Sequence, residues 1–165
     1  MPAYSYKERF IPMVKDGSKP HTIRSRRKHP AKPGDVLHHY FGLRTKHCIK
    51  IAEDICRDVK SIYINEHGCI FLLEGRLSDD QASMLLNNPH LLETMKWSLT
   101  IGPRRFRRLN VWEENTLAWL DGFRPDGSTL ENPMNAHELM TRFWKQTHEL
   151  PFLGDIIYRQ PYVNN

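Results

Sequence analysis

The first half of the chain is divided by polar turns into short segments that are typical of strands, and this spacing limits the folds that the chain can adopt. These segments, together with a last one near the carboxyl end, occupy residues 21–25, 36–41, 44–50, 59–64, 69–73 and 152–158. The polar stretches 33–35 and 65–68 contain the glycines and prolines of turns. Strands this short and this closely spaced are typical of a curved, mostly antiparallel sheet. The spacing therefore predicts an α+β protein built on a small, mostly antiparallel β-barrel.

Other segments predict helices around this sheet. Residues 4–15 predict a short extended segment followed by one or two turns of helix. Ser78, followed by two aspartates, is typical of a helix start, and this helix is expected to end before Pro89. Another helix is predicted over 115–120, with Gly122 at its C-terminal end.

The last predicted helix begins at Asn135, with Glu138 as the partner in a capping box. Its apolar residues recur at helical spacing, and they are expected to pack in the core rather than to bind a ligand. They are Leu139, Met140, Phe143 and Trp144.

The chain of 165 residues has the length of one domain, and we expect a single domain over residues 1–165. The segment at about 83–113 has no clear hydrophobic period. We expect it to be an insertion, consisting of an added helix and loop that close over the barrel.

The sequence favours a cytoplasmic protein that does not bind a membrane. No apolar run approaches the roughly 18 residues of a spanning helix, and the first residues lack the charged start and apolar stretch of a signal peptide. The three cysteines are an odd number without C-x-x-C spacing, so reduced thiols are expected. A zinc site at His47, Cys48 and Cys56 is the less favoured alternative.

The positive charge is concentrated in two places. The formal net charge is +5. One basic group is the loop that contains Arg24, Arg26, Arg27, Lys28 and Lys32, and the other is Arg104, Arg105, Arg107 and Arg108 around Phe106. A polyanion suits such groups, because each phosphate contact releases counterions and an aromatic ring can stack on a base. RNA is the expected partner and single-stranded DNA the second choice, while a solvated surface is the alternative for either group.

The segment from Gly17 to Arg24 has the features of a binding or catalytic site. Pro20 restricts Lys19 to an extended conformation, and the strand begins after it. The two-residue period of a strand then places Thr22 and Arg24 on the face opposite to His21 and Ile23. One face of this strand therefore carries a hydroxyl and a cation.

Several motifs along the chain resemble the ASCH family, a branch of the PUA-like superfamily of small β-barrels associated with RNA. The resemblance covers nearly the whole chain except 83–113, and it implies a PUA-like barrel flanked by helices that binds RNA or a modified nucleoside in a basic cleft. The motifs occur in the order of the family, and they are Phe10, Gly17 to Arg24, Pro33-Gly34-Asp35, Arg44 to Cys48, Asp121-Gly122-Phe123 and Phe143-Trp144.

The resemblance also implies candidate catalytic residues. Some ASCH proteins cleave the amide of an acylated cytidine with a lysine, a threonine and an acidic residue. These correspond to Lys19, Thr22 and Asp121, where those proteins have glutamate in the last position. A threonine hydroxyl needs a base, and a lysine can be that base only if its pKa falls from roughly 10. The acid would orient the reacting groups and protonate the departing amine.

Two alternatives remain open for these residues. The first is a non-catalytic RNA-binding module, in which Lys19 binds phosphate and Asp121 forms a salt bridge. The second is a metal-free ribonuclease, as some ASCH proteins are. The histidines at 38 and 39 are expected to be strand residues rather than bases. The sequence has no phosphate-binding glycine loop and no spaced acidic cluster, so we expect no cofactor and no metal. The predicted binding residues are Arg24, Arg26, Arg27, Arg44, Thr45, Lys46, Arg105 and Arg107.

Overall fold

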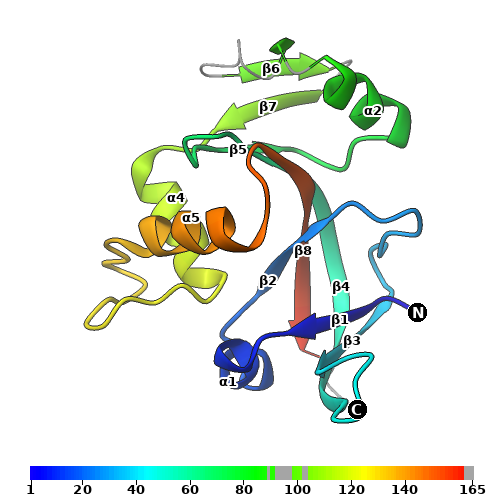
Figure 1. The fold of residues 1–165 in the computed structure, drawn as a ribbon, viewed down its shortest axis with the longest axis vertical. Coiled ribbons are helices and arrows are strands. Elements are labelled where there is room, and N and C mark those ends of the chain that lie inside the picture. Colours follow the sequence, from blue (N-terminus) through cyan, green and yellow to red (C-terminus); the bar gives the residue numbers. More distant parts are fainter. Residues whose placement is uncertain (89, 92–97, 102–103, 162–165) are drawn as a thin grey trace.

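The computed structural model describes residues 1–88, 90–91, 98–101 and 104–161, with only the backbone described for 98–101, 104–105 and 161. It has an α+β architecture, as predicted, with helices packed around one mixed sheet (Figure 1). Its elements are β1 (Ala3–Tyr6), the 3-10 helix η1 (Glu8–Phe10), α1 (Ile11–Lys15), β2 (His21–Ser25), β3 (Val36–Phe41), β4 (Ile49–Ile64), β5 (Ile70–Leu73), α2 (Asp79–Asn87), β6 (Ser98–Ile101), β7 (Arg104–Arg108), α4 (Val111–Leu120), α5 (Ala136–Thr147) and β8 (Phe152–Pro161).

The long strand β4 organises the sheet. The main path of the sheet runs β1-β3-β4-β5-β7-β6, while β8 pairs with both β4 and β2. All described pairings are antiparallel except β1 with β3, which confirms the prediction of a mostly antiparallel sheet. The pairings between described strands form an open path, so they do not confirm the predicted barrel.

Residues 44–50 and 59–64 were expected to form separate strands, and this prediction is wrong. β4 runs without interruption from Ile49 to Ile64, and it bends at an irregularity between Cys56 and Asp58. Residues 44–46 instead belong to the turn before β4, where Arg44 has a positive φ of 74°. Such a backbone conformation interrupts a strand, because the strand requires a negative φ at every residue.

The segment 83–113 was expected to be an added helix and loop, and the expected loop is wrong for residues 98–101 and 104–108, which form strands, while residues 90–91 are helical. After the predicted helix α2, the chain forms β6 and β7, which extend the sheet beyond β5. Phe106 lies fully buried in the middle of β7 between arginines, and β7 pairs with both β5 and β6. Residues 89, 92–97 and 102–103 of this segment lie outside the described residues.

The capping box predicted for α5 is wrong as well. Asn135 has a left-handed backbone, with φ 62°, and its side chain makes no capping hydrogen bond. The capping side chain normally requires an extended backbone. Glu138 instead accepts a hydrogen bond from Arg142, at 2.9 Å. A complete capping box occurs at the start of α4, where Asn110 and Glu113 bond to each other's backbone.

Two groups of buried apolar side chains stabilise the structure. The first core lies among β2, β4, β8, α4 and α5, and it includes Phe10, Phe123, Met140, Trp144 and Ile156. The second core lies where β5, β7 and α2 meet, and it includes Tyr63, Phe71, Leu73, Leu85 and Phe106. Figure 1 shows α2, β6 and β7 at one end of the molecule and α1, β1 and β3 towards the other. Among the described residues, no helix has the length and apolar character needed to cross a bilayer.

Candidate functional site

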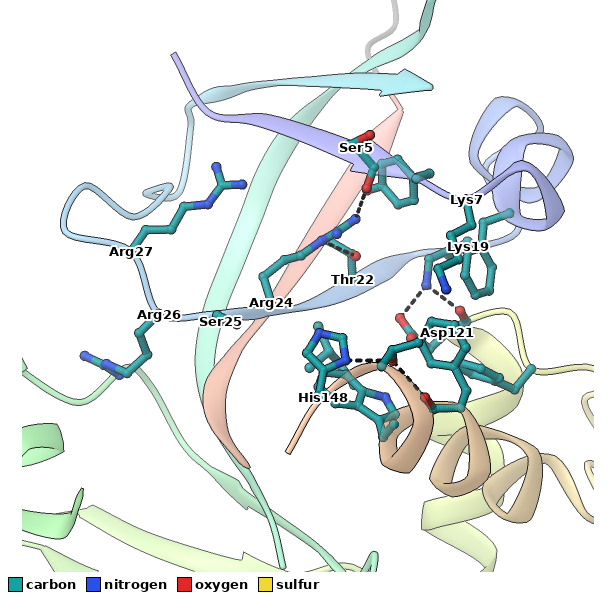
Figure 2. A pocket seen from close by; sticks show the side chains of 17 residues that line it. Ser5, Lys7, Lys19, Thr22, Arg24, Ser25, Arg26, Arg27, Asp121 and His148 are labelled. Atoms are coloured by element: carbon teal, nitrogen blue, oxygen red, sulfur yellow. Dashed lines mark hydrogen bonds and ion pairs between the residues drawn. The ribbon is translucent and has the colours of Figure 1, made fainter. Parts of the chain in front are cut away.

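A pocket of about 700 Å³ lies where β1, β2 and the ends of α4 and α5 meet. Figure 2 shows its side chains converging from segments that are far apart in the sequence. The residues that line it are Ser5, Tyr6, Lys7, Phe10, Lys19, Thr22, Ile23, Arg24, Ser25, Arg26, Arg27, Asp121, Phe123, Phe143, Trp144, Thr147 and His148.

The turn before β2 positions Lys19. Its backbone N–H donates to the carbonyl of Met13 at 3.0 Å, and its own carbonyl accepts a hydrogen bond from the guanidinium of Arg159. Arg159 also pairs with Asp54, so β8 and β4 both support the turn. The Lys19 side chain is therefore held in the wall of the pocket, where it is only 2% exposed.

The C-terminal end of α4 brings Asp121 to the same place. Asp121 follows the last residue of the helix, and Gly122 continues the chain with φ 96°, so the predicted glycine at this helix end is confirmed. An added Cβ at Gly122 would lie 2.9 Å from Cδ1 of Phe10. The close approach of this turn to Phe10 therefore requires glycine.

Lys19 and Asp121 form a buried pair, although they are 102 residues apart in the sequence. The Lys19 ammonium donates to both Oδ1 and the backbone carbonyl of Asp121. Burial lowers the pKa of Lys19 from 10.5 to about 8, even though the charge of Asp121 opposes this shift. Burial also raises the pKa of Asp121 above its usual value. Both shifts have the same cause, because burial penalises the charged form of each group.

His21 lies beside this pair as a neutral imidazole. Its Nε2 is 3.7 Å from Oδ1 of Asp121, and its ring packs edge-on against Tyr158. Burial, and then the charge of Lys19, lower the pKa of His21 to about 3. His21 therefore contributes no positive charge to the site at neutral pH.

Thr22 and Arg24 lie on one face of β2, as predicted. The hydroxyl of Thr22 accepts a hydrogen bond from Nε of Arg24 at 3.1 Å, and Nη2 of Arg24 donates to the carbonyl of Ser5 at 2.9 Å. In the described part of the chain, no hydrogen bond joins the hydroxyl of Thr22 to Lys19.

The two arginines that follow β2 differ in their partners. Arg26 pairs with Asp155 and Asp79, at 3.2 and 3.1 Å, so its charge is already compensated. Arg27 donates to the carbonyl of Ala3 at 3.0 Å and lies over the ring of Tyr4. Arg27 therefore keeps a positive charge that no described carboxylate neutralises.

Four of the predicted binding residues with described side chains are not brought into this pocket. Arg44, Thr45 and Lys46 are absent from its lining, and the hydroxyl of Thr45 donates to the carbonyl of Gly42 within its own turn. Arg107 lies on β7, where two nitrogens contact the carboxylate of Glu113 at 2.8 Å. The side chain of Arg105 is outside the described part of the structure. The expectation that residues 44–46 share the cleft is wrong, because the turn before β4 holds them elsewhere.

The sequence missed several residues of the pocket. Phe143 and Trp144 of α5 line the pocket, although the apolar face of this helix was expected to pack only in the core. Trp144 is 3% exposed, so it packs in the core and also lines the pocket. Lys7 lies with its ammonium 4.6 Å from the centre of the Phe143 ring. The motif Phe143-Trp144 in the sequence could have indicated these two pocket residues, but no sequence pattern indicated Lys7 or His148.

His148 lines the pocket, and the hydrogen bonds of Thr147 indicate its tautomer. The hydroxyl of Thr147 donates to the carbonyl of Phe143 at 2.7 Å, so its oxygen is left to accept from Nδ1–H of His148, 2.8 Å away. Nε2 of His148 is then the unprotonated nitrogen. Partial burial, with Arg24 and Lys7 nearby, lowers the pKa of His148. The imidazole is therefore neutral at pH 7 and able to accept a proton.

His39 does not line the pocket but contacts Tyr6, which does. It is fully buried in β3, as expected of a strand residue, and its Nδ1 is 3.0 Å from the hydroxyl of Tyr6. Its Nε2 lies 2.9 Å from Oδ2 of Asp54. This chain of contacts fixes the ring of Tyr6, which lines the pocket.

In the part of the chain that the structure describes, no three His, Cys, Asp or Glu side chains are grouped so that they could hold a metal ion. Comparison of the chain with protein-family models, with curated proteins and with solved structures gave no match.

Proposed function

We propose that the protein is an ASCH-like protein with a PUA-like fold that binds RNA or a modified nucleoside in this pocket and hydrolyses the acyl amide of an N4-acylated cytidine. The observation that carries the proposal is the contact between Lys19 and Asp121 in the wall of a pocket large enough for a nucleoside. The rings of Phe10, Phe123 and Phe143 line the same pocket and suit a flat base.

The lowered pKa of Lys19 allows this residue to act as a general base beside Asp121. With a pKa of about 8, a useful fraction of Lys19 is neutral near pH 7 and can accept the proton of an attacking hydroxyl, from Thr22 or from water. The attack forms a C–O bond at the acyl carbon, and the C–N bond of the amide then breaks. The protonated Lys19 returns its proton to the leaving nitrogen. If Thr22 is the nucleophile, a water then attacks the resulting ester and releases the acid from Thr22. By either route one water is consumed overall, and the products are a carboxylic acid and cytidine.

Two other functions each have an observation in their favour. The Thr22 hydroxyl accepts a hydrogen bond from Arg24, and among the described residues it has none from Lys19; this favours a module that binds RNA and does not react. The neutral His148 in a pocket that also contains lysines favours a metal-free ribonuclease, in which the histidine takes the proton of a ribose hydroxyl. A cytoplasmic location belongs to the same proposal, and the three free thiols of Cys48, Cys56 and Cys69 are consistent with a reducing compartment.

Incubation with N4-acetylcytidine and, separately, with labelled single-stranded RNA tests the proposal, with products identified by mass. We expect acetate and intact cytidine from the first substrate. Lys19→Met and Thr22→Ala should each lower kcat/KM by at least about a hundredfold, the scale for losing a positioned acid, base or nucleophile. Thr22→Ser keeps the hydroxyl and should keep most of the activity.

The pH dependence provides an independent check. Because the base must be neutral, kcat/KM should rise with pH up to about 8 and then level off. Shortened RNA without acetate release would favour the ribonuclease. Binding without any product would favour the RNA-binding module. In either case the amidohydrolase proposal is wrong, provided that the melting curves of the variants match that of wild type.

A further inference from the structure

The charges that line the pocket do not balance. Its described lining contains five cationic side chains and one carboxylate, that of Asp121. Lys19 is paired with Asp121, and Arg26 is paired with Asp155 and Asp79. The cations of the lining that have no carboxylate partner among the described residues are Lys7, Arg24 and Arg27. Such an excess of positive charge suits a ligand that brings its own negative charge.

Arg24 and Arg27 lie near the same aromatic ring. Their guanidinium carbons are 5.7 and 4.5 Å from the centre of the Tyr4 ring. Arg24 uses Nε and Nη2 to bond Thr22 and Ser5, and its side chain also interacts with the hydroxyl of Tyr6. Arg27 uses only Nη1. The two cations therefore lie near one aromatic ring, and Arg27 keeps N–H groups that no described residue accepts.

This cationic region is separate from the proposed reaction centre. Figure 2 shows Lys19 and Asp121 at one end of the pocket, Arg27 at the other, and Arg24 between them. Arg24 follows Thr22 by two residues on β2, which is about 7 Å along a strand. A ligand that spans both ends would place an uncharged ring near Asp121 and an anionic group near the arginines.

We propose that Arg24 and Arg27 form a subsite for the phosphate of a pyrimidine nucleoside monophosphate, with the base directed towards Lys19 and Asp121. The proposal rests on the proposed function, and it changes the substrate class from a free nucleoside to a mononucleotide. Guanidinium groups bind phosphate oxygens in pairs of charge-assisted hydrogen bonds, and two of them from different directions fix its position. The ring of Tyr4 holds both side chains in place beforehand.

Calorimetric titration of the full-length protein with cytidine and with cytidine 5′-monophosphate tests this subsite. We expect the monophosphate to bind about tenfold more tightly or better, since charge-assisted hydrogen bonds are the stronger class. Arg27→Ala should reduce that ratio to near one, and Arg27→Lys should restore part of it. Arg27 is the appropriate variant because Arg24 also contacts Thr22. Arg57→Ala is the matched control, since Arg57 is exposed and does not line the pocket; it should keep the wild-type ratio.

The outcomes separate this proposal from the proposed function. Equal affinity for the two ligands, no binding of either, or a ratio that Arg27→Ala does not change would overturn the phosphate subsite, even if N4-acetylcytidine is hydrolysed. If only a single-stranded RNA oligonucleotide shows dependence on Arg27, the ligand is a strand and the mononucleotide proposal is overturned. If the monophosphate binds through Arg27 but no amide is cleaved, the subsite stands and the hydrolase proposal fails.

Discussion

At the scale of single residues, burial determines the chemistry of the site. Lys19 and Asp121 are both almost inaccessible, and in each of them burial opposes the charged form. A buried pair of this kind contributes little net stability, because desolvation of the two groups offsets their attraction. Its consequence is instead a lysine that can lose its proton close to neutral pH.

The protonation of His21 provides a test of how completely this region excludes water. The pKa of His21 is about 3 in the folded protein, against 6.5 for an ordinary histidine, so between these pH values the unfolded chain binds a proton that the folded chain does not. The free energy of unfolding contributed by this residue is thus fully present above pH 6.5 and falls as the pH is lowered towards 3. The loss should be on the order of several kcal/mol.

The measurement is urea denaturation of wild type and His21→Phe between pH 7 and 4. The phenylalanine keeps a ring against Tyr158 but cannot bind a proton, so the variant should lose less stability on acidification than wild type. His67→Gln, which removes an exposed imidazole, serves as the control. Parallel curves for wild type and His21→Phe would mean that His21 is not desolvated.

At the scale of elements, the ends of strands and helices assemble the site. The turn before β2 supplies Lys19, the C-terminal end of α4 supplies Asp121, and the C-terminal end of α5 supplies His148. The geometry of these ends therefore matters more to the pocket than the helices themselves. Gly122 is the critical residue at the end of α4, because it combines a positive φ with contact to Phe10.

Replacing Gly122 by alanine should cost more than replacing Gly34. The two glycines have nearly the same backbone, with φ 96° and 92°, so alanine is strained to a similar extent in both, by roughly 1–2 kcal/mol. A Cβ at Gly34 meets nothing within 4 Å, whereas at Gly122 it collides with Phe10 and approaches Met13 at 3.2 Å. Gly122→Ala should therefore lose about 1–3 kcal/mol more of unfolding free energy in urea denaturation. Equal losses for the two variants would show that Phe10 moves aside without cost.

At the scale of the whole molecule, the two cores serve different purposes. The first core contributes Phe10, Phe123 and Trp144 to the pocket. No residue of the second core lines the pocket in the described part of the chain. The strands β7 and β6 extend the sheet away from the site, and the helix α2 lies at the same end of the molecule (Figure 1).

This separation predicts different effects for two buried phenylalanines. Phe106→Ala and Phe123→Ala remove side chains that are at most 1% exposed, and each should lower the free energy of unfolding by about 3–5 kcal/mol. Nucleotide affinity, measured by titration at a temperature where both variants are folded, should fall only for Phe123→Ala. A comparable loss of affinity in Phe106→Ala would mean that the second core supports the pocket.

The sequence by itself predicted the local features well. Alternating apolar residues and turn sequences are local signals, so they predicted β2, β3, β5, β8 and the helix that begins at Asp79. The same applies to the shared face of Thr22 and Arg24, which follows from the strand period alone. The three proposed catalytic residues came from the resemblance of motifs; the structure brings Lys19 and Asp121 into contact, while their catalytic role stays a prediction.

Only the tertiary structure decided which charges meet. The sequence does not distinguish Arg26, Arg27 and Arg107, because all three are arginines in basic segments. In the structure, carboxylates far along the chain neutralise Arg26, and Glu113 pairs with Arg107. Arg27 has no carboxylate partner among the described residues. The expectation for residues 44–46 failed for a similar reason, since a turn directs their backbone away from the pocket. The lowered pKa of Lys19 depends on burial by elements from both halves of the chain. Charge compensation and desolvation are properties of three-dimensional packing, and no local pattern of residues encodes them.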